Sequence, residues 1–315
     1  MQTDVFKILP KIAPMQGLAR IAVLAAALTI TACGDQKKDG PTDTMTTGKI
    51  EISVDETYRP VIEQQLKVFD SSYPEAKITA NYKAEAECFK DLFENKARMI
   101  LVTRQLTAEE KAWCEQQKIV TESLELVRDA VAVILPPGAT DTMFSVDQIK
   151  GILMGTYNKK YTVVFDDQAS STVRYITDSL LRGQKLGTNV FAAKGNDSVV
   201  AYVAKNPDAI GFVGLSYVGN PEGTTGDNEF ITNVKIASIY NDKTQRAYKP
   251  YQAYIAQRVY PFSRNLYYIK HETYPGLGTG FANFLARERG QLIFAHSHLF
   301  PLRMNIVIRD AAISR

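Results

Sequence analysis

The sequence predicts an α/β protein built from two units, each with a mainly parallel sheet flanked by helices. Two observations carry this prediction. Segments of strand character alternate with amphipathic helical segments, and the alternation restarts after Pro136-Pro137-Gly138. The chain has 315 residues, of which 45% are hydrophobic and 23% are charged. These values are typical of a globular protein, and the length suggests about two domains, each large enough for its own core.

The first unit is predicted from residue 49 onward. Ile50, Ile52 and Val54 alternate with polar residues as in a half-buried strand, and a helical stripe follows over 57–71. The run 98–102 is largely apolar, which is typical of a strand that is covered on both faces. The elements predicted for this unit are strands 49–54, 76–82, 98–102 and 124–135, helices 57–71 and 84–95, and a helix opened by the capping box Thr107/Glu110.

The second unit repeats the alternation. Ser145 and Gln148 form a capping pattern that opens helix 146–154. Apolar residues on one side predict helix 172–181, and the short apolar run 210–213 predicts a buried strand. The other elements predicted are strand 161–165, helix 197–205, a glycine-rich surface loop at 221–228, a tyrosine-dense β-like stretch at 248–269, and one or two helices at 280–298.

The N-terminus has the pattern of an export signal. The apolar run 21–32 follows Arg20 and is too short to span a bilayer, so residues 1–32 are predicted to be a signal peptide. Its end, ITAC, resembles a lipobox, which implies cleavage before Cys33 and attachment of lipid to that cysteine. An ordinary secretory signal with a chance cysteine is the alternative. Met15 is a second possible start of translation.

Residues 33–48 are polar and without periodicity, which predicts a flexible tether to the folded body. The net charge is +3, of which the first 32 residues carry +2, so the body is nearly neutral and a nucleic-acid binder is not favoured. Cys88 and Cys114 lie in an exported chain, where a disulfide is possible, but two buried thiols are favoured.

Polar residues follow strands at three points where a helix begins. Backbone N–H groups, hydroxyls and the helix dipole favour an anion at such a point, and a guanidinium presents a planar fork to an oxyanion. Taken alone, each hydroxyl-bearing segment could also be an ordinary helix cap, and Arg104 could be a surface arginine in a turn. The candidate anion-binding residues are Thr57, Tyr58, Arg104, Ser170, Ser171 and Thr172.

Five segments carry a resemblance to a known family, the PstS-like substrate-binding lipoproteins of phosphate ABC transporters. They are DETYRP (55–60), LVTRQLT (101–107), VVFDDQASSTVRYI (163–176), NPDAIGFVG (206–214) and TGFANFLARERGQ (279–291). The resemblance implies a two-lobed periplasmic-binding-protein fold with a ligand cleft between the lobes. Lobe 1 is then expected over 49–132 and 252–315, and lobe 2 over 133–251.

The function implied is a lipid-anchored receptor that binds inorganic phosphate and delivers it to ABC permease subunits in the membrane. Such a protein faces the periplasm or the cell exterior and is expected to be a monomer without catalytic residues, cofactor or metal. The same fold tuned to another oxyanion, or used as a sensor, is an alternative.

The sequence departs from the family pattern at two charged positions. Asp166 stands where many members have an arginine, and Arg104 stands where many have an aspartate. Arg104 is therefore expected to supply the positive charge. Because the family aspartate is missing, another carboxylate would have to accept the hydrogen bond from protonated phosphate. Sulfate has no proton to donate in this way. Glu85 is slightly favoured for this role, and Glu56, Glu87 and Asp166 remain open.

A secreted phosphatase or esterase with Ser170 or Ser171 as nucleophile is a weaker alternative. The sequence contains no G-x-S-x-G or H-E-x-x-H motif. Its three histidines, His271, His296 and His298, all lie near the end of the chain. The sequence therefore predicts a binding protein rather than an enzyme.

Overall fold

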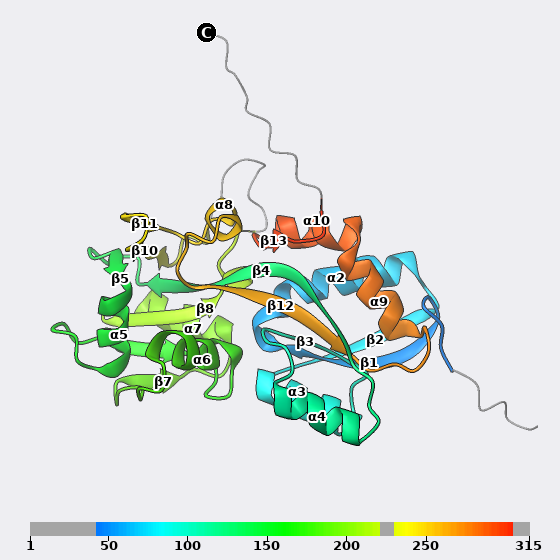
Figure 1. Cartoon of the computed structure of the whole chain (residues 1–315). Coiled ribbons are helices and arrows are strands. Elements are labelled where there is room, and N and C mark those ends of the chain that lie inside the picture. Colours follow the sequence, from blue (N-terminus) through cyan, green and yellow to red (C-terminus); the bar gives the residue numbers. More distant parts are fainter. Residues whose placement is uncertain (1–41, 221–229, 305–315) are drawn as a thin grey trace, which may run out of the picture. The chain divides into compact units, whose positions relative to one another are not determined.

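The computed structural model describes residues 42–220 and 230–304, and Figure 1 shows the arrangement of their elements. The predicted signal peptide, Cys33 and the predicted loop at 221–228 lie outside the described residues. Among the residues that are described, no helix is both long and apolar enough to cross a membrane.

A mixed sheet of ten strands runs through the structure in the order β2-β1-β3-β12-β4-β8-β6-β7, with β9 and β13 each paired to β4. Strand β1 pairs in parallel with β2 and β3, and β6 pairs in parallel with β7 and β8. The strands are β1 (Gly48–Asp55), β2 (Ala76–Lys83), β3 (Met99–Val102), β4 (Glu122–Leu135), β6 (Thr162–Phe165), β7 (Val190–Ala192), β8 (Ala209–Gly214), β9 (Lys235–Ile236), β12 (Ser263–Lys270) and β13 (Phe300–Pro301).

Helices flank the sheet and connect its parallel strands. They are α2 (Arg59–Ser72), α3 (Glu85–Phe93), α4 (Ala108–Gln116), α5 (Val146–Met154), α6 (Ser171–Tyr175), α7 (Asn196–Lys205), α8 (Gln252–Ala256), α9 (Leu277–Ala286) and α10 (Glu288–His296). Shorter turns are η2 (Glu56–Tyr58), the π-helix η3 (Ile176–Leu181) and η4 (Leu215–Tyr217). A separate small sheet contains β5 (Met143–Ser145), β10 (Ser238–Asn241) and β11 (Arg246–Tyr248).

Two groups of buried side chains divide the structure into two α/β lobes, which confirms the predicted fold class. The first lobe contains β1, β2 and β3, and its sheet is covered on both faces. Met99 and Leu101 of β3 pack toward α2 and α9, while Ile100 and Val102 pack toward α3. The second lobe has its own core around β6 and β8. The exact residue boundaries of the lobes remain a prediction.

The two long strands β4 and β12 cross between the lobes, and Figure 1 shows them running side by side. Ser263 pairs with Ala130, and the N–H of Val131 donates to the carbonyl of Phe262 at 2.9 Å. The core of the first lobe ends at Val127 along β4, and the core of the second lobe begins at Ala130. Charged side chains occupy the junction between these cores: Arg128, Asp129 and Arg264 are all buried.

One predicted element is wrong in part. The tyrosine-dense stretch 248–269 is not continuously extended, because α8 interrupts it between β11 and β12. The ring of Tyr254 packs against those of Tyr248 and Tyr251, where Tyr248 lies on the edge strand β11 of the small sheet. Cys88 and Cys114 are both buried free thiols, so no disulfide joins them.

Candidate functional site

The first polar segment lies at the carboxyl end of β1, where the strand passes into η2. Asp55 is buried, and its Oδ1 atom accepts hydrogen bonds from the Thr57 backbone N–H at 3.1 Å and from the Thr57 hydroxyl at 2.8 Å. Asp55 is therefore the cap of this turn, and the alternative interpretation of Thr57 as an ordinary helix cap is wrong. The reason is that the carboxylate of Asp55 accepts a hydrogen bond from the backbone N–H two residues downstream, as in an Asx turn.

The second polar segment lies at the start of α6. Ser170 caps this helix, because its hydroxyl accepts a hydrogen bond from the N–H of Val173 at 3.3 Å. The next two residues, Ser171 and Thr172, are fully buried. The hydroxyl oxygens of Ser171 and Thr57 are 3.4 Å apart, so the two lobes are in direct contact here.

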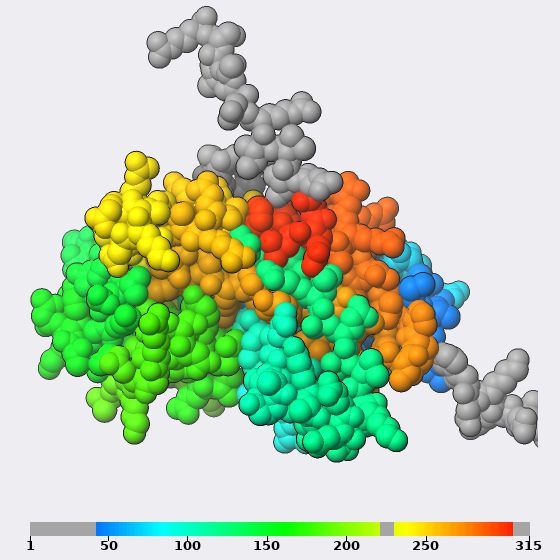
Figure 2. Space-filling view, in the orientation of Figure 1, coloured from blue at the N-terminus to red at the C-terminus, as the bar shows by residue number. Residues whose placement is uncertain are grey.

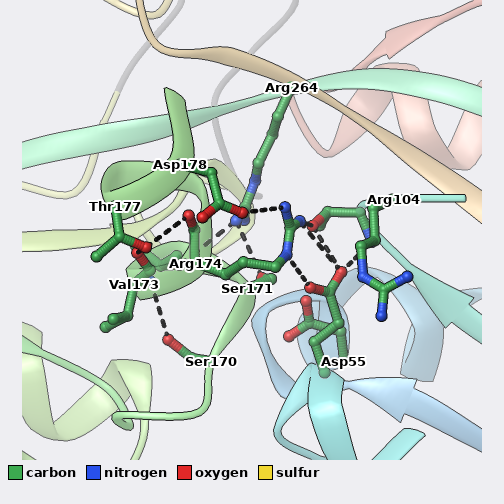
Figure 3. Close-up of polar contacts among 12 residues, drawn as sticks. Asp55, Arg104, Ser170, Ser171, Val173, Arg174, Thr177, Asp178 and Arg264 are labelled. Atoms are coloured by element: carbon green, nitrogen blue, oxygen red, sulfur yellow. Dashed lines mark hydrogen bonds and ion pairs between the residues drawn. The ribbon is translucent and has the colours of Figure 1, made fainter. Parts of the chain in front are cut away.

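A buried arginine on β12 joins these two segments. Arg264 is 5% exposed, and its Nη1 atom donates to the hydroxyls of Ser171 at 3.0 Å and Thr172 at 3.4 Å. Its Nε atom donates to Oδ2 of Asp129 at 2.8 Å, and the hydroxyl of Tyr58 donates to the same oxygen at 2.8 Å. Figure 3 shows Arg264 reaching toward Ser171. We call Asp55, Thr57, Tyr58, Asp129, Ser171, Thr172 and Arg264 the interlobe cluster.

Sequence reasoning missed Arg264, although a signal for it exists. Along β12 the inward-facing positions are Arg264, Leu266 and Tyr268, which alternate with less buried residues. A charged residue at an otherwise apolar position of a strand has to be buried, and a buried charge is normally paired. The strand pattern therefore marks Arg264 as a buried, ion-paired side chain.

The structure does not bring the guanidinium of Arg104 to the interlobe cluster. It donates to both carboxylate oxygens of Glu110, at 2.7 and 2.8 Å, and lies 3.6 Å from the centre of the Phe89 ring. Figure 3 shows it apart from the guanidinium of Arg264. Glu110 is held in place because it belongs to the capping box that opens α4, so its carboxylate lies within reach of Arg104.

The interlobe cluster contains buried polar atoms that lack a hydrogen-bond partner within 42–220 and 230–304. These atoms are Oδ2 of Asp55, Oδ1 of Asp129 and Nη2 of Arg264. Burial and the charge of Glu85 together raise the pKa of Asp55 to about 7, and the charge of Arg264 opposes this shift. Since buried polar atoms are nearly always satisfied, this arrangement suits a ligand that accepts from a guanidinium and donates to a carboxylate.

A second set of contacts joins the lobes beside the interlobe cluster. Glu85 is 2% exposed; its Oε2 atom accepts from Nε of Arg174 at 2.5 Å, and its Oε1 atom accepts from the backbone N–H and the hydroxyl of Thr103, both at 2.7 Å. Nη2 of Arg174 also donates to the Thr103 hydroxyl at 2.6 Å. Arg174 lies on α6 of the second lobe, whereas Glu85 and Thr103 belong to the first. We call these three residues the interlobe bridge (Figure 3).

The other candidate carboxylates have different surroundings. Glu56 accepts hydrogen bonds from Asn196 and from the hydroxyl of Tyr217, both at 2.6 Å, which makes a further contact between the lobes. Asp166 accepts from the same Asn196 side chain at 3.1 Å, and burial raises its pKa. Glu87 is exposed on α3. None of these carboxylates contacts Arg264 in the part of the chain that is described.

Gly214, at the end of β8, permits the close packing of the interlobe cluster. A Cβ atom at this position would lie 2.1 Å from Cγ2 of Thr57 and 3.5 Å from Nη2 of Arg264. Any side chain would therefore displace Thr57 or occupy the space beside the guanidinium. The Gly214 N–H donates to Oδ1 of Asn196 at 3.2 Å, which fixes this backbone in place.

The arrangement favours an anion and offers little to a cation. No group of three or more His, Cys, Asp or Glu side chains that could hold a metal ion occurs among the described residues. The guanidinium and the hydroxyls of the interlobe cluster are instead donors that converge from both lobes. A tetrahedral oxyanion is the kind of ligand that such donors recognise.

Comparisons with known proteins identify the superfamily and the fold of the chain. A family model described as "PBP superfamily domain" matches residues 39–289. No curated protein matches the chain in sequence.

Three solved structures show the same fold. A protein from Clostridium perfringens, assigned as a phosphate ABC transporter substrate-binding protein and solved with bound phosphate, is 22% identical with a TM-score of 0.68, over 81% of this chain and 100% of that one. An ABC-type phosphate transport receptor from Vibrio cholerae is 17% identical with a TM-score of 0.62, over 80% and 99%. The CcmR regulatory domain from Synechocystis, in complex with 2-PG, is 14% identical with a TM-score of 0.51, over 80% and 98%.

Proposed function

The chain belongs to the PBP superfamily, and on this basis we propose that it is an extracytoplasmic receptor for inorganic phosphate. The observation that carries the proposal is the buried guanidinium of Arg264, which has a free Nη2 atom among the described residues and lies against the hydroxyls of Ser171 and Thr172. Phosphate receptors of ABC transporters are among the structures that share its fold, and one of them holds phosphate. Arg264 takes the role that the sequence analysis assigned to Arg104.

Phosphate would bind where the two lobes now touch. The 3.4 Å between the hydroxyl oxygens of Thr57 and Ser171 leaves no room for a tetrahedral anion, so the lobes must separate to admit it. After closure the same hydroxyls, with Thr172, would donate to phosphate oxygens from both sides. Arg264 would donate through Nη2 while Nε keeps its bond to Asp129. Tyr58 would act through Asp129, and Ser170 by capping α6.

Asp55 is better placed than Glu85 to accept the proton of phosphate. Both oxygens of Glu85 are engaged by Thr103 and Arg174, whereas Oδ2 of Asp55 is buried without a partner in the described structure. Monohydrogen phosphate can donate a hydrogen bond from its hydroxyl group to ionised Asp55. Sulfate has no proton at neutral pH, so it can bind only when Asp55 itself is protonated and donates to it.

The proposal predicts that selectivity for phosphate over sulfate grows with pH. Above about 7 the protonated fraction of Asp55 falls tenfold for each pH unit, so sulfate binding should weaken about tenfold per unit. Phosphate binding should change little over the same alkaline range, because monohydrogen phosphate pairs with ionised Asp55. Calorimetric titration with each anion at several pH values above neutrality measures both trends.

The matched variants are Asp55→Asn and Glu85→Gln, each of which replaces a carboxylate by its amide. Asp55→Asn should remove the pH dependence of sulfate binding and reduce the phosphate preference. Glu85→Gln should keep the phosphate preference and shift the pH dependence of sulfate binding to lower pH, because the charge of Glu85 no longer raises the pKa of Asp55. The reverse result would assign the proton-accepting role to Glu85. Sulfate binding as tight as phosphate binding at every pH would contradict the proposal.

We propose binding rather than catalysis for the serine residues. The Ser171 hydroxyl lies against Arg264, Thr57 and the carboxyl of Asp55, and the hydroxyl of Ser170 caps a helix. Neither serine has a hydrogen bond to a histidine in the described part of the chain, which is the usual partner of a nucleophilic serine. A receptor of this kind needs no cofactor.

We further propose that Cys33 carries lipid, that the mature chain is tethered to a membrane as a monomer, and that ABC permease subunits receive the phosphate. The lipobox-like ITAC sequence supports the anchor, and the polar stretch after it supports a tether. Mass spectrometry of the mature N-terminal peptide is expected to show acylated Cys33 as the first residue. An unmodified peptide that begins elsewhere would count against the anchor.

A further inference from the structure

A basic hollow of the described structure lies beside the interlobe cluster and shares Arg264 with it. It is a cavity of about 640 Å³ between α5, η3, the turn after β10 and the segment that leads into β12. In Figure 2 the orange atoms of that segment lie between yellow atoms above and green atoms of the second lobe below. The cationic residues that line it are Arg128, Lys150, Arg182, Lys243, Arg258 and Arg264.

The charge around this cavity is poorly balanced. Its lining contains two carboxylates, of Asp147 and Asp242, against six cations. Lys150 is paired with Asp147 at 3.2 Å, and Arg264 is paired with Asp129 at 2.8 Å outside the lining. Across 42–220 and 230–304, no carboxylate lies within ion-pair distance of Arg182, Lys243 or Arg258. A concave surface with an excess of one charge concentrates ions of the opposite charge.

Two arginines of the lining, Arg128 and Arg258, carry like charges that act on each other. Arg128 is largely buried and donates to the carbonyls of Ile255 and Ala256 at 3.3 and 2.8 Å, which holds it beside Arg258. Burial lowers the pKa of Arg128, and the charge of Arg258 lowers it further, so the two cations repel each other. A bound anion would relieve this repulsion.

We propose that this cavity binds a small polyanion, a molecule with two or more phosphate groups, at a site beside the interlobe cluster. The cations come from five separate segments around the cavity, which is a wider spread than one orthophosphate can contact. Linked phosphates can reach several of them at once. A hollow of this size also suits a small molecule better than a folded partner.

The wall of the cavity is continuous with the interlobe cluster. The hydroxyl of Tyr175 donates to the carbonyls of Ser263 at 3.1 Å and Pro261 at 3.4 Å, which ties the end of α6 to the start of β12. Helix α6 begins with Ser171, and β12 carries Arg264. A ligand in the cavity would therefore contact both elements that supply donors to the interlobe cluster, from the side away from Thr57.

The test uses purified full-length protein in detergent, saturated with orthophosphate so that the interlobe cluster is occupied. Tripolyphosphate is then titrated calorimetrically into the wild type, Arg258→Asn and Lys118→Asn. Arg258 and Lys118 are matched, because both are exposed cations with left-handed φ angles of 57° and 58°, which asparagine tolerates. Lys118 does not line the cavity.

We expect one tripolyphosphate per chain in the wild type and in Lys118→Asn, and affinity weaker by about tenfold or more in Arg258→Asn. Arg182→Asn should weaken it similarly, while orthophosphate binding stays unchanged in all three variants. No binding to the wild type, or an equal loss in Lys118→Asn, would overturn the proposal. A poly-glutamate peptide that binds more tightly than tripolyphosphate, with the same dependence on Arg258, would overturn it in favour of an acidic protein segment.

Discussion

Replacing Arg264 by lysine is expected to weaken phosphate binding by about 10- to 100-fold. Lysine keeps the charge and can still pair with Asp129, but its single ammonium group cannot also reach Ser171 and the anion. The loss of one hydrogen bond to a charged group costs about 1.5–3 kcal/mol, which corresponds to this range of affinity. Calorimetric titration of the purified protein with phosphate measures the change.

Arg104→Lys is the matched control for this experiment. Arg104 is paired with Glu110 and lies over the ring of Phe89, so its replacement should leave phosphate affinity unchanged. Thermal unfolding should show that both variants are folded, because each retains its positive charge. If Arg104→Lys loses affinity and Arg264→Lys does not, the positive partner of phosphate is Arg104, as the sequence pattern suggests.

Breaking the interlobe bridge should accelerate the release of phosphate by about tenfold. Arg174→Gln leaves the buried carboxylate of Glu85 without its cation, and Glu85→Gln removes the charge from the other side. Loss of one partner of a buried charge pair acts mainly on the dissociation rate. The side chain of Arg174 is 30% exposed, so solvent reduces the effect below that of a fully buried pair. Rapid filtration of protein loaded with radiolabelled phosphate measures the rate.

Two further variants distinguish the interlobe bridge from a general effect of charge. Asp178→Asn removes only the exposed contact between Arg174 and the following π-helix η3, at 3.6 Å, and should leave the rate of phosphate release unchanged. The double variant Arg174→Gln/Glu85→Gln should release phosphate no faster than the faster single variant, because both changes break one interaction. Wild-type release rates in both single variants would show that the interlobe bridge does not retain the ligand.

The features that could be predicted from the sequence depend on residues that are close together in the chain. The alternation of Ile50, Ile52 and Val54 indicates a strand, and the three hydroxyls before α6 mark a strand–helix junction where Ser171 and Thr172 are found buried. These signals are local, because capping and periodicity involve residues a few positions apart.

Contacts between distant segments are what the sequence does not show. Arg264 meets Asp129 and Ser171 only because β12 crosses from one lobe to the other beside β4. Arg104 follows a buried strand, as an anion-binding residue would, yet Glu110 binds it from the next helix. Whether a charged side chain points at a ligand or at a neighbour depends on the tertiary structure rather than on spacing.

The pairing of β4 with β12 also determines how the halves of the protein can move. Because Ser263 and Ala130 are in register and Val131 is hydrogen-bonded to Phe262, sliding one strand along the other would break these bonds, whereas bending the ribbon would keep them. The motion that remains is rotation about an axis across the ribbon. Arg264 belongs to the ribbon itself, opposite Asp129, whereas Glu85 and Arg174 are on the helices α3 and α6 of the two lobes. Bending the ribbon would therefore separate Glu85 from Arg174 while it leaves Arg264 paired with Asp129.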